Sequence, residues 1–266
     1  MQVTHPQGMY NGLPMEDVFI ALDDMGTEMG LGYIVYQYQP HLYPDCPINL
    51  YFKLDCQPSA RYILFGALVA RARQLRDANP NVGARVYTDV NPADERTKEF
   101  YLHSGFACTD TEEVLELPIP QGDGRIPMSC AVAPVPLNTP EERYAFLSRL
   151  QQHDVRFMDE NYLLNLQRLP HFLALGLYRN NDLIGEIVLA GEGSQCELVV
   201  MYIVPGSRRQ GMGKALLHRC MAIMAAEGVE SVNCRIMTRS IPMHRLCAAF
   251  GAKSLGVTMV YPSLPL

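Results

Sequence analysis

The hydrophobic pattern of the second half of the chain predicts alternating helices and strands. Apolar residues recur at helical spacing over 213–226, so we expect a helix there. Residues 197–204 are apolar almost without interruption, which is typical of a strand buried on both faces. Asn180–Asp182 predicts a tight turn. The expected order is helix 140–151, helix 154–168, strand 172–178, strand 183–190, strand 197–204, helix 213–226, strand 232–238, helix 241–250 and strand 255–260.

The first half repeats this order in shortened form. We expect strands near 17–23, 31–39 and 48–55, a helix over 60–78, a strand over 84–88, a helix over 92–104 and a strand near 113–118. The segment Ala84–Thr88 followed by Pro92 matches Cys234–Thr238 followed by Pro242. A repeat of this length indicates duplication of a domain rather than a solenoid.

Proline and glycine gather between residues 118 and 140, and such residues mark a connection between domains. A helix start follows, with Thr139 as N-cap, Pro140 at the first helical position and Glu142 three residues after the cap. We therefore expect two domains, 1–125 and 126–266.

The composition of the 266 residues narrows the classes of function. The net charge of −6 argues against a nucleic-acid partner, because phosphate binding requires a basic surface. No apolar run approaches the length that spans a membrane, and the N-terminus has no pattern of a secretory signal. These features predict a soluble cytoplasmic protein without a membrane partner, and they leave the oligomeric state open.

The eight cysteines show no metal-binding or disulfide pattern. No two are spaced C-x-x-C, and several lie within apolar runs. They are expected to be free thiols packed in the core of a protein in a reducing compartment, and no metal site is expected.

The loop after Pro205 has the features of an anion site. A buried strand ends there and a helix begins a few residues later, so the unpaired amides of the helix N-terminus can face a phosphate. Gly211 and Gly213 permit close approach of the backbone, and Arg208, Arg209 and Lys214 add positive charge. An ordinary basic surface loop is the alternative. The loop does not match the Walker A pattern, because Met212 stands where that pattern requires a lysine. It does not match the Rossmann pattern either, because Leu216 stands where that pattern requires its last glycine.

The loop resembles the pyrophosphate loop of the GNAT acetyltransferase superfamily, whose pattern is V-x-P-x-x-R-x-x-G-x-G/A. Ile203-x-Pro205, Arg208, Gly211 and Gly213 fill its positions. The resemblance extends over residues 128–260, since the order of elements is also that of the family. It implies an α/β (α+β) fold of two tandem GNAT-like domains, each a mixed, largely antiparallel sheet flanked by helices, with a splayed central strand pair.

The first half looks like a degenerate copy of this fold. Its corresponding loop, Gln57–Phe65, has no glycine that would bring backbone amides to a pyrophosphate. We expect coenzyme binding only in the second half.

The resemblance implies acetyl-CoA as the donor and an amine of a small molecule or peptide as the acceptor, without a metal. The implied coenzyme-binding residues are Met201, Ile203, Arg208, Arg209, Gln210, Gly211, Met212, Gly213, Lys214 and Ser240. Backbone groups of Met201 and Ile203 would pair with the pantetheine arm, and an amide near Ile203 would polarise the thioester carbonyl.

Glu197 stands where several family members carry the general base that deprotonates the amine. Its position along the strand predicts the same face as Met201 and Ile203. The alternative is that Glu197 only begins the strand at the surface.

Three positions depart from the family's pattern. Cys247 replaces the usual tyrosine acid, Ala252 replaces the phenylalanine after the last glycine, and Ser240 replaces an asparagine. Cys247 is expected to be a core residue rather than an acid. These departures leave two alternatives to an N-acetyltransferase: a non-catalytic acyl-CoA-binding or regulatory protein, and an acyltransferase for a longer acyl chain or a hydroxyl acceptor.

Overall fold

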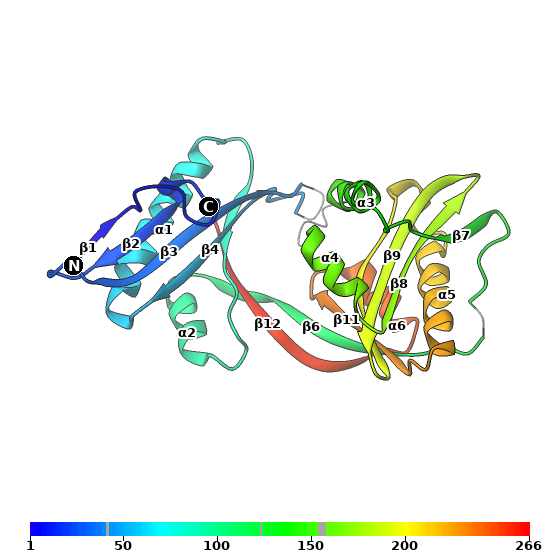
Figure 1. Ribbon diagram of the computed structural model, residues 1–266. Helices are drawn as coiled ribbons and strands as arrows, with labels where there is room; N and C mark the ends of the chain where they lie inside the picture. Colours follow the sequence, from blue (N-terminus) through cyan, green and yellow to red (C-terminus); the bar gives the residue numbers. More distant parts are fainter. Residues whose placement is uncertain (41–42, 123, 154–157) are drawn as a thin grey trace. The chain divides into compact units, whose positions relative to one another are not determined.

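The computed structural model describes residues 1–40, 43–122, 124–153 and 158–266. It divides into two compact units. Unit 1 comprises Met1–Thr111 and Met259–Leu266, and unit 2 comprises Glu112–Thr258. Each unit is a mixed, largely antiparallel sheet flanked by helices, as the sequence predicts (Figure 1).

Unit 1 has one parallel strand pair in an otherwise antiparallel sheet. Its strands follow the order β1-β2-β3-β4-β5, and the end of β12 pairs with β5. Among the described strand pairs of this unit, β4 and β5 run parallel. Its elements are β1 (Gln2–Thr4), β2 (Val18–Leu22), β3 (Glu28–Tyr38), β4 (Ile48–Cys56), α1 (Arg61–Asp77), β5 (Ala84–Tyr87), α2 (Glu95–His103), the start of β6 (Ala107–Pro118) and the end of β12 (Lys253–Pro265).

Unit 2 has the strand order β7-β8-β9-β10-β11-β6, in which β10 and β11 are parallel. Its elements are the rest of β6, β7 (Cys130–Pro134), α3 (Pro140–Gln152), α4 (Glu160–Gln167), β8 (His171–Arg179), β9 (Asp182–Glu192), β10 (Gln195–Ile203), α5 (Met212–Ala226), β11 (Ser231–Met237), α6 (Ile241–Ala248) and the start of β12. The expected helix 154–168 is described only from residue 158, and α4 occupies its second part.

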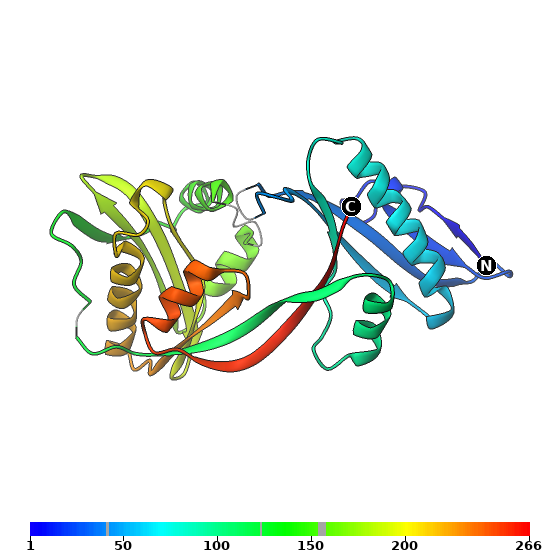
Figure 2. The ribbon, with the colours of Figure 1, turned by 180° about the vertical axis from the view of Figure 1, so that it is seen from behind.

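Two hydrophobic cores lie on opposite faces of the sheet of unit 2 (Figures 1 and 2). The helices α5 and α6 cover one face, where Leu216, Leu217 and Cys220 are fully buried. The helices α3 and α4 cover the other, where Phe146 and Leu163 are fully buried. Among the described residues of unit 1, buried side chains of α1 and α2 pack in one hydrophobic core with those of the sheet.

The start of α3 forms as the sequence predicts. The Thr139 hydroxyl accepts a hydrogen bond from the amide of Glu142 at 3.2 Å, and the Glu142 carboxylate accepts one from the amide of Thr139 at 3.0 Å. Pro140 occupies the first turn, where its missing N–H costs nothing. This reciprocal cap fixes the point at which α3 begins.

The compact units differ from the expected division at residue 125. The strand after α2 was expected to complete the first domain, but residues 112–118 of β6 pair with β11 in unit 2. The chain end was expected to complete the second domain, but Ser263–Pro265 pair with β5 in unit 1. Each unit therefore takes a strand from the other half of the sequence. Pairing between strands so far apart in the sequence cannot be predicted from local sequence patterns.

Candidate functional site

The parallel pair β10 and β11 separates part of the way along β10. Their registered pairing runs from Gln195 with Ser231 to Leu198 with Cys234. On the other side, β9 remains paired with β10 as far as Ile203. Residues 199–203 thus have one paired edge and one edge without a registered strand partner in the described part of the chain. This is the splayed strand pair that the resemblance predicts.

A β-bulge in β10 lies at the point of separation. The register between β10 and β9 shifts between Leu198 and Val200. A bulge adds one residue to a strand and bends it, and it reverses the alternation of side chains beyond it. It therefore accounts both for the divergence from β11 and for the side-chain directions that follow.

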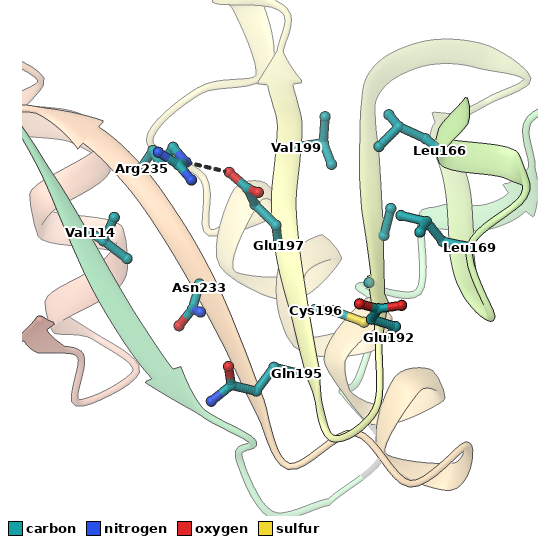
Figure 3. Close-up of a pocket in the computed structure, with 12 residues that line it drawn as sticks. Val114, Leu166, Leu169, Glu192, Gln195, Cys196, Glu197, Val199, Asn233 and Arg235 are labelled. Carbon is teal, nitrogen blue, oxygen red and sulfur yellow. Dashed lines mark hydrogen bonds and ion pairs between the residues drawn. The ribbon is translucent and has the colours of Figure 1, made fainter. Parts of the chain in front are cut away.

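The expectation that Glu197 shares a face with Met201 and Ile203 is wrong. Met201 and Ile203 point toward α5: a Cβ atom built on Gly213 would lie 3.0 Å from Met201 Cε and 3.7 Å from Ile203 Cγ1. Glu197 lines a cavity with Leu166 of α4, on the opposite face of the sheet (Figure 3). The extra residue of the bulge is the cause, since it inverts the side-chain alternation between Glu197 and Met201.

Two polar side chains of the loop between β10 and α5 hold the loop itself. The Nε–H of Arg208 donates to the carbonyl oxygen of Ile203 at 2.7 Å. Gln210 donates to the carbonyl of Gly206 at 3.0 Å and accepts from Arg179 at 2.8 Å. Arg208 and Gln210 therefore shape the loop from within.

The backbone of the loop turns sharply into α5. Arg209 has a φ of 59° and Gly211 a φ of 76°, both in the left-handed region. Gly211 is the N-cap of α5 and has no side-chain cap, and a Cβ atom built on it would meet nothing within 4 Å. Open space therefore lies beside Gly211 at the start of α5. The first amides of a helix have no intrahelical acceptors, so this end of α5 can hold an anion.

Gly213 and the cationic residues Arg209 and Lys214 also lie at the start of α5. The absence of a side chain at Gly213 lets α5 approach Met201 of β10. Met212 is buried, whereas Arg209 and Lys214 are exposed.

A cavity of about 460 Å³ adjoins the first turns of α5, and its lining includes Arg125, Gly211, Lys214 and His218. Ser240 is the N-cap of α6 and directly follows the turn after β11.

A second cavity, of about 360 Å³, lies against the other face of the sheet (Figure 3). Its lining is both polar and apolar, and consists of Val114, Leu166, Leu169, Ala190, Gly191, Glu192, Gln195, Cys196, Glu197, Val199, Asn233 and Arg235. Glu197 is joined to Arg235 by an Nε to Oε1 contact of 2.8 Å. The side chain of Glu197 is 41% exposed, so its carboxylate is within reach of a molecule in this cavity.

Two neighbours of Glu197 were not predicted from the sequence. The Glu197 carboxylate raises the pKa of the Arg235 guanidinium by hydrogen bonding and by its charge. Burial and the charge of Glu197 raise the pKa of Tyr162 on α4. Arg235 lies in a segment that matches the first half, but that match gives no indication of an ion pair.

A buried carboxylate near the same strands was also missed. Glu186 on β9 is 1% exposed and receives hydrogen bonds from Arg149 of α3 at 2.6 and 3.1 Å. The Tyr202 hydroxyl donates to it at 2.6 Å. A charged residue within the apolar strand 183–190 was the available signal, since a buried charge requires a partner. The cluster fastens α3 to β9 and β10.

Cys247, at the position of the family's tyrosine, is a residue of α6 and is fully buried in the core that α5 and α6 cover. It is hydrogen-bonded to Cys234 of β11, and this bond together with burial raises the pKa of the Cys234 thiol. A thiol enclosed in this way packs the core.

We expect Cys247→Ala to change turnover by less than about threefold, because the thiol is fully buried. Its loss from the core should lower the free energy of unfolding by roughly 0.5–3 kcal/mol. Thiol release under saturating substrates and chemical denaturation measure the two effects. A rate loss above about tenfold, or about 1.4 kcal/mol of barrier, with unchanged coenzyme affinity would instead make Cys247 a catalytic residue.

Comparison with known proteins agrees with this geometry. The sequence pattern of the Acetyltransferase (GNAT) family matches residues 138–252. A search of curated proteins gives no significant match. Residues 138–252 belong to the GNAT acetyltransferase family.

Solved structures with the same fold extend over nearly the whole chain. A GCN5-related N-acetyltransferase from Sphaerobacter thermophilus has a TM-score of 0.53 and 13% identity, covering 96% of this chain and 82% of its own. A tandem GNAT protein from the clavulanic acid biosynthesis pathway has a TM-score of 0.51 and 13% identity, covering 93% and 82%. A probable N-acyltransferase from Enterococcus faecalis V583 has a TM-score of 0.58 and 13% identity, covering 92% and 61%. At this identity the likeness concerns the fold.

The described residues contain no cluster of three or more His, Cys, Asp or Glu side chains that would hold a metal ion. Among the helices of that same part of the chain, none is long and apolar enough to cross a membrane.

Proposed function

We propose that unit 2 transfers an acetyl group from acetyl-CoA to an amine by direct attack of the amine on the thioester. The observation that carries the proposal is the combination of a splayed strand β10 with an open helix N-terminus at Gly211. The two features supply the binding groups that a coenzyme with a pyrophosphate and an amide-containing arm requires.

The coenzyme-binding residues in this proposal act mainly through the backbone. The amides at Gly211, Met212 and Gly213 would hold the pyrophosphate, with Arg209 and Lys214 adding charge. The free edge of β10 at Met201 and Ile203 would pair with the amides of the pantetheine arm. Ser240, at the start of α6, would contact the same arm.

The acceptor amine would occupy the cavity of about 360 Å³ beside Glu197. An ammonium ion cannot attack, so a base must first remove a proton. Glu197 would accept that proton, directly or through water. The amine nitrogen would then bond to the thioester carbon, and a backbone N–H of β10 near Ile203 would stabilise the negative charge that develops on the carbonyl oxygen. The C–S bond breaks as the carbonyl re-forms, the thiolate leaves, and the nitrogen loses its second proton to the thiolate or to solvent, which gives the neutral amide.

One observation favours the alternative of a non-catalytic acyl-CoA-binding protein. Cys247 is buried where the family carries a phenol, so this position offers no proton donor to the leaving thiolate. Thiols are much more acidic than alcohols or amines, so a thiolate can leave without a proton donor.

An assay with acetyl-CoA and a panel of primary amines separates the two functions. Acetyl transfer should release free thiol at a rate that depends on the amine, with the acetylated amine detected by mass. Coenzyme binding without amine-dependent thiol release would contradict the enzymatic proposal and favour the binding protein.

A further inference from the structure

The cavity beside Glu197 offers hydrogen-bond acceptors and negative charge at both of its ends. Glu197 lies at one end, and Glu192 lies at the other, where the hairpin between β9 and β10 turns (Figure 3). The one lining cation, Arg235, is already bound to Glu197 at 2.8 Å and lies 3.9 Å from Glu112. The charged side chains of the lining therefore carry a net negative charge.

A buried carbonyl oxygen lies beside Glu197, on the side of β10 away from Glu192. Among the described residues, Oδ1 of Asn233 has no hydrogen-bond partner although it is shielded from solvent. Asn233 is the registered neighbour of Glu197 on β11, and it lines the cavity. Burying a hydrogen-bond acceptor without a partner costs free energy, so we expect a bound molecule to donate a hydrogen bond to this oxygen.

The neighbouring strand adds to the negative charge of this face. In the pairing of β6 with β11, Glu116 is opposite Asn233. Residues directly opposite each other in an antiparallel pair lie on the same face of the sheet. A ligand above Asn233 thus meets carboxylates on both neighbouring strands, from Glu197 on β10 and from Glu116 on β6.

The register also gives the spacing between the two carboxylates that line the cavity. Glu197 is paired with Ala190, and Glu192 lies two residues further along β9. Such diagonal neighbours on one face are about 7–8 Å apart. Leu166, Leu169 and Val199 provide an apolar wall. The cavity therefore suits an apolar chain with a cationic nitrogen at each end.

We propose that the acceptor is a dicationic amine: one nitrogen is acetylated beside Glu197 and Asn233, and a second cationic nitrogen binds near Glu192. This inference rests on the proposed function. The nitrogen beside Glu197 would also donate to Oδ1 of Asn233, and the second nitrogen would be attracted by Glu192, which favours amines with two charges over amines with one.

The test compares 1,5-diaminopentane with 1-aminopentane, which share a carbon chain and differ in the second amine. With acetyl-CoA saturating, we expect kcat/KM to be at least about tenfold higher for the diamine at low salt. Glu192→Gln should reduce this preference about fivefold. Added salt should also reduce the preference, because screening weakens the attraction between exposed charges. Glu28→Gln, an exposed carboxylate at the start of β3, is the matched control and should behave as the wild type.

Equal kcat/KM for the two amines would overturn the inference, as would a preference that Glu192→Gln leaves undiminished. A protein that binds coenzyme A in a calorimetric titration and acetylates neither amine would also overturn it. Failure to bind coenzyme A would instead overturn the proposed function, so the two failures are distinguishable.

Discussion

Gly211→Glu is expected to weaken coenzyme A binding at least about a hundredfold, equivalent to about 2.7 kcal/mol, while the protein remains folded. Gly211 is the N-cap of α5, and the space beside it is open. A glutamate there would fill the place of the pyrophosphate and repel its charge. Isothermal titration calorimetry measures the affinity, and circular dichroism checks the fold.

The backbone strain of this substitution needs its own control. Gly211 has a φ of 76°, so a side chain there costs roughly 1–2 kcal/mol of stability. Gly228, which follows the other end of α5, has a φ of 93° and equally open surroundings. Gly228→Glu should therefore carry similar strain and leave coenzyme affinity unchanged. Undiminished affinity in a folded Gly211→Glu variant would contradict the loop assignment.

Glu197→Gln is expected to lower kcat about 10²-fold or more, within the range of general-base catalysis. The affinity for acetyl-CoA should stay the same, because Glu197 lines the cavity on the face opposite Met201 and Ile203. Initial rates across acetyl-CoA and amine concentrations separate the two effects. The deficit should shrink as the pH approaches the pKa of the amine, about 10.4 for a lysine-like acceptor, since the amine then loses its proton without a base.

Arg235→Gln distinguishes a base from a structural ion pair. This substitution breaks the contact of 2.8 Å and keeps the Glu197 carboxylate. We expect it to lower kcat less than about tenfold. If Arg235→Gln and Glu197→Gln lose rate equally, with the same pH dependence, the ion pair rather than the base carries the effect.

The sequence correctly predicted structural features that depend on residues close to one another in the chain. The cap of α3 needed only Thr139, Pro140 and Glu142, and it forms as expected. The helix α5 extends from Met212 to Ala226, close to the range given by its apolar spacing. The left-handed turn into it depends on Gly211. In each case the residues that cause the feature are within a few positions of it.

Features that depend on distant pairing were not predictable in this way. The bulge after Leu198 arises from the register of β10 against β9, and it reverses the side-chain alternation beyond Glu197. The exchange of β6 and β12 between the units depends on partners far away in sequence. The position of Arg235 beside Glu197 likewise results from the register of β11 with β10. No periodicity in the sequence encodes these registers.

The connection before α1 in unit 1 differs in length and backbone from the loop before α5 in unit 2. Residues 57–60 separate β4 from α1, whereas residues 204–211 separate β10 from α5, so the connection is half as long. The short helix Pro58–Ala60 leads directly into α1, and Ala60, the N-cap, is itself helical. In the described residues of this connection, no left-handed residue opens the helix start.

Calorimetric titration of the full-length chain with coenzyme A tests the central claim most directly. One binding site per chain, lost in Gly211→Glu, is the result we predict, because the connection before α5 has a left-handed glycine N-cap with open space beside it and the corresponding connection before α1 has none. Two equivalent sites per chain, or a single site that survives Gly211→Glu unchanged, would contradict the assignment of coenzyme binding to unit 2.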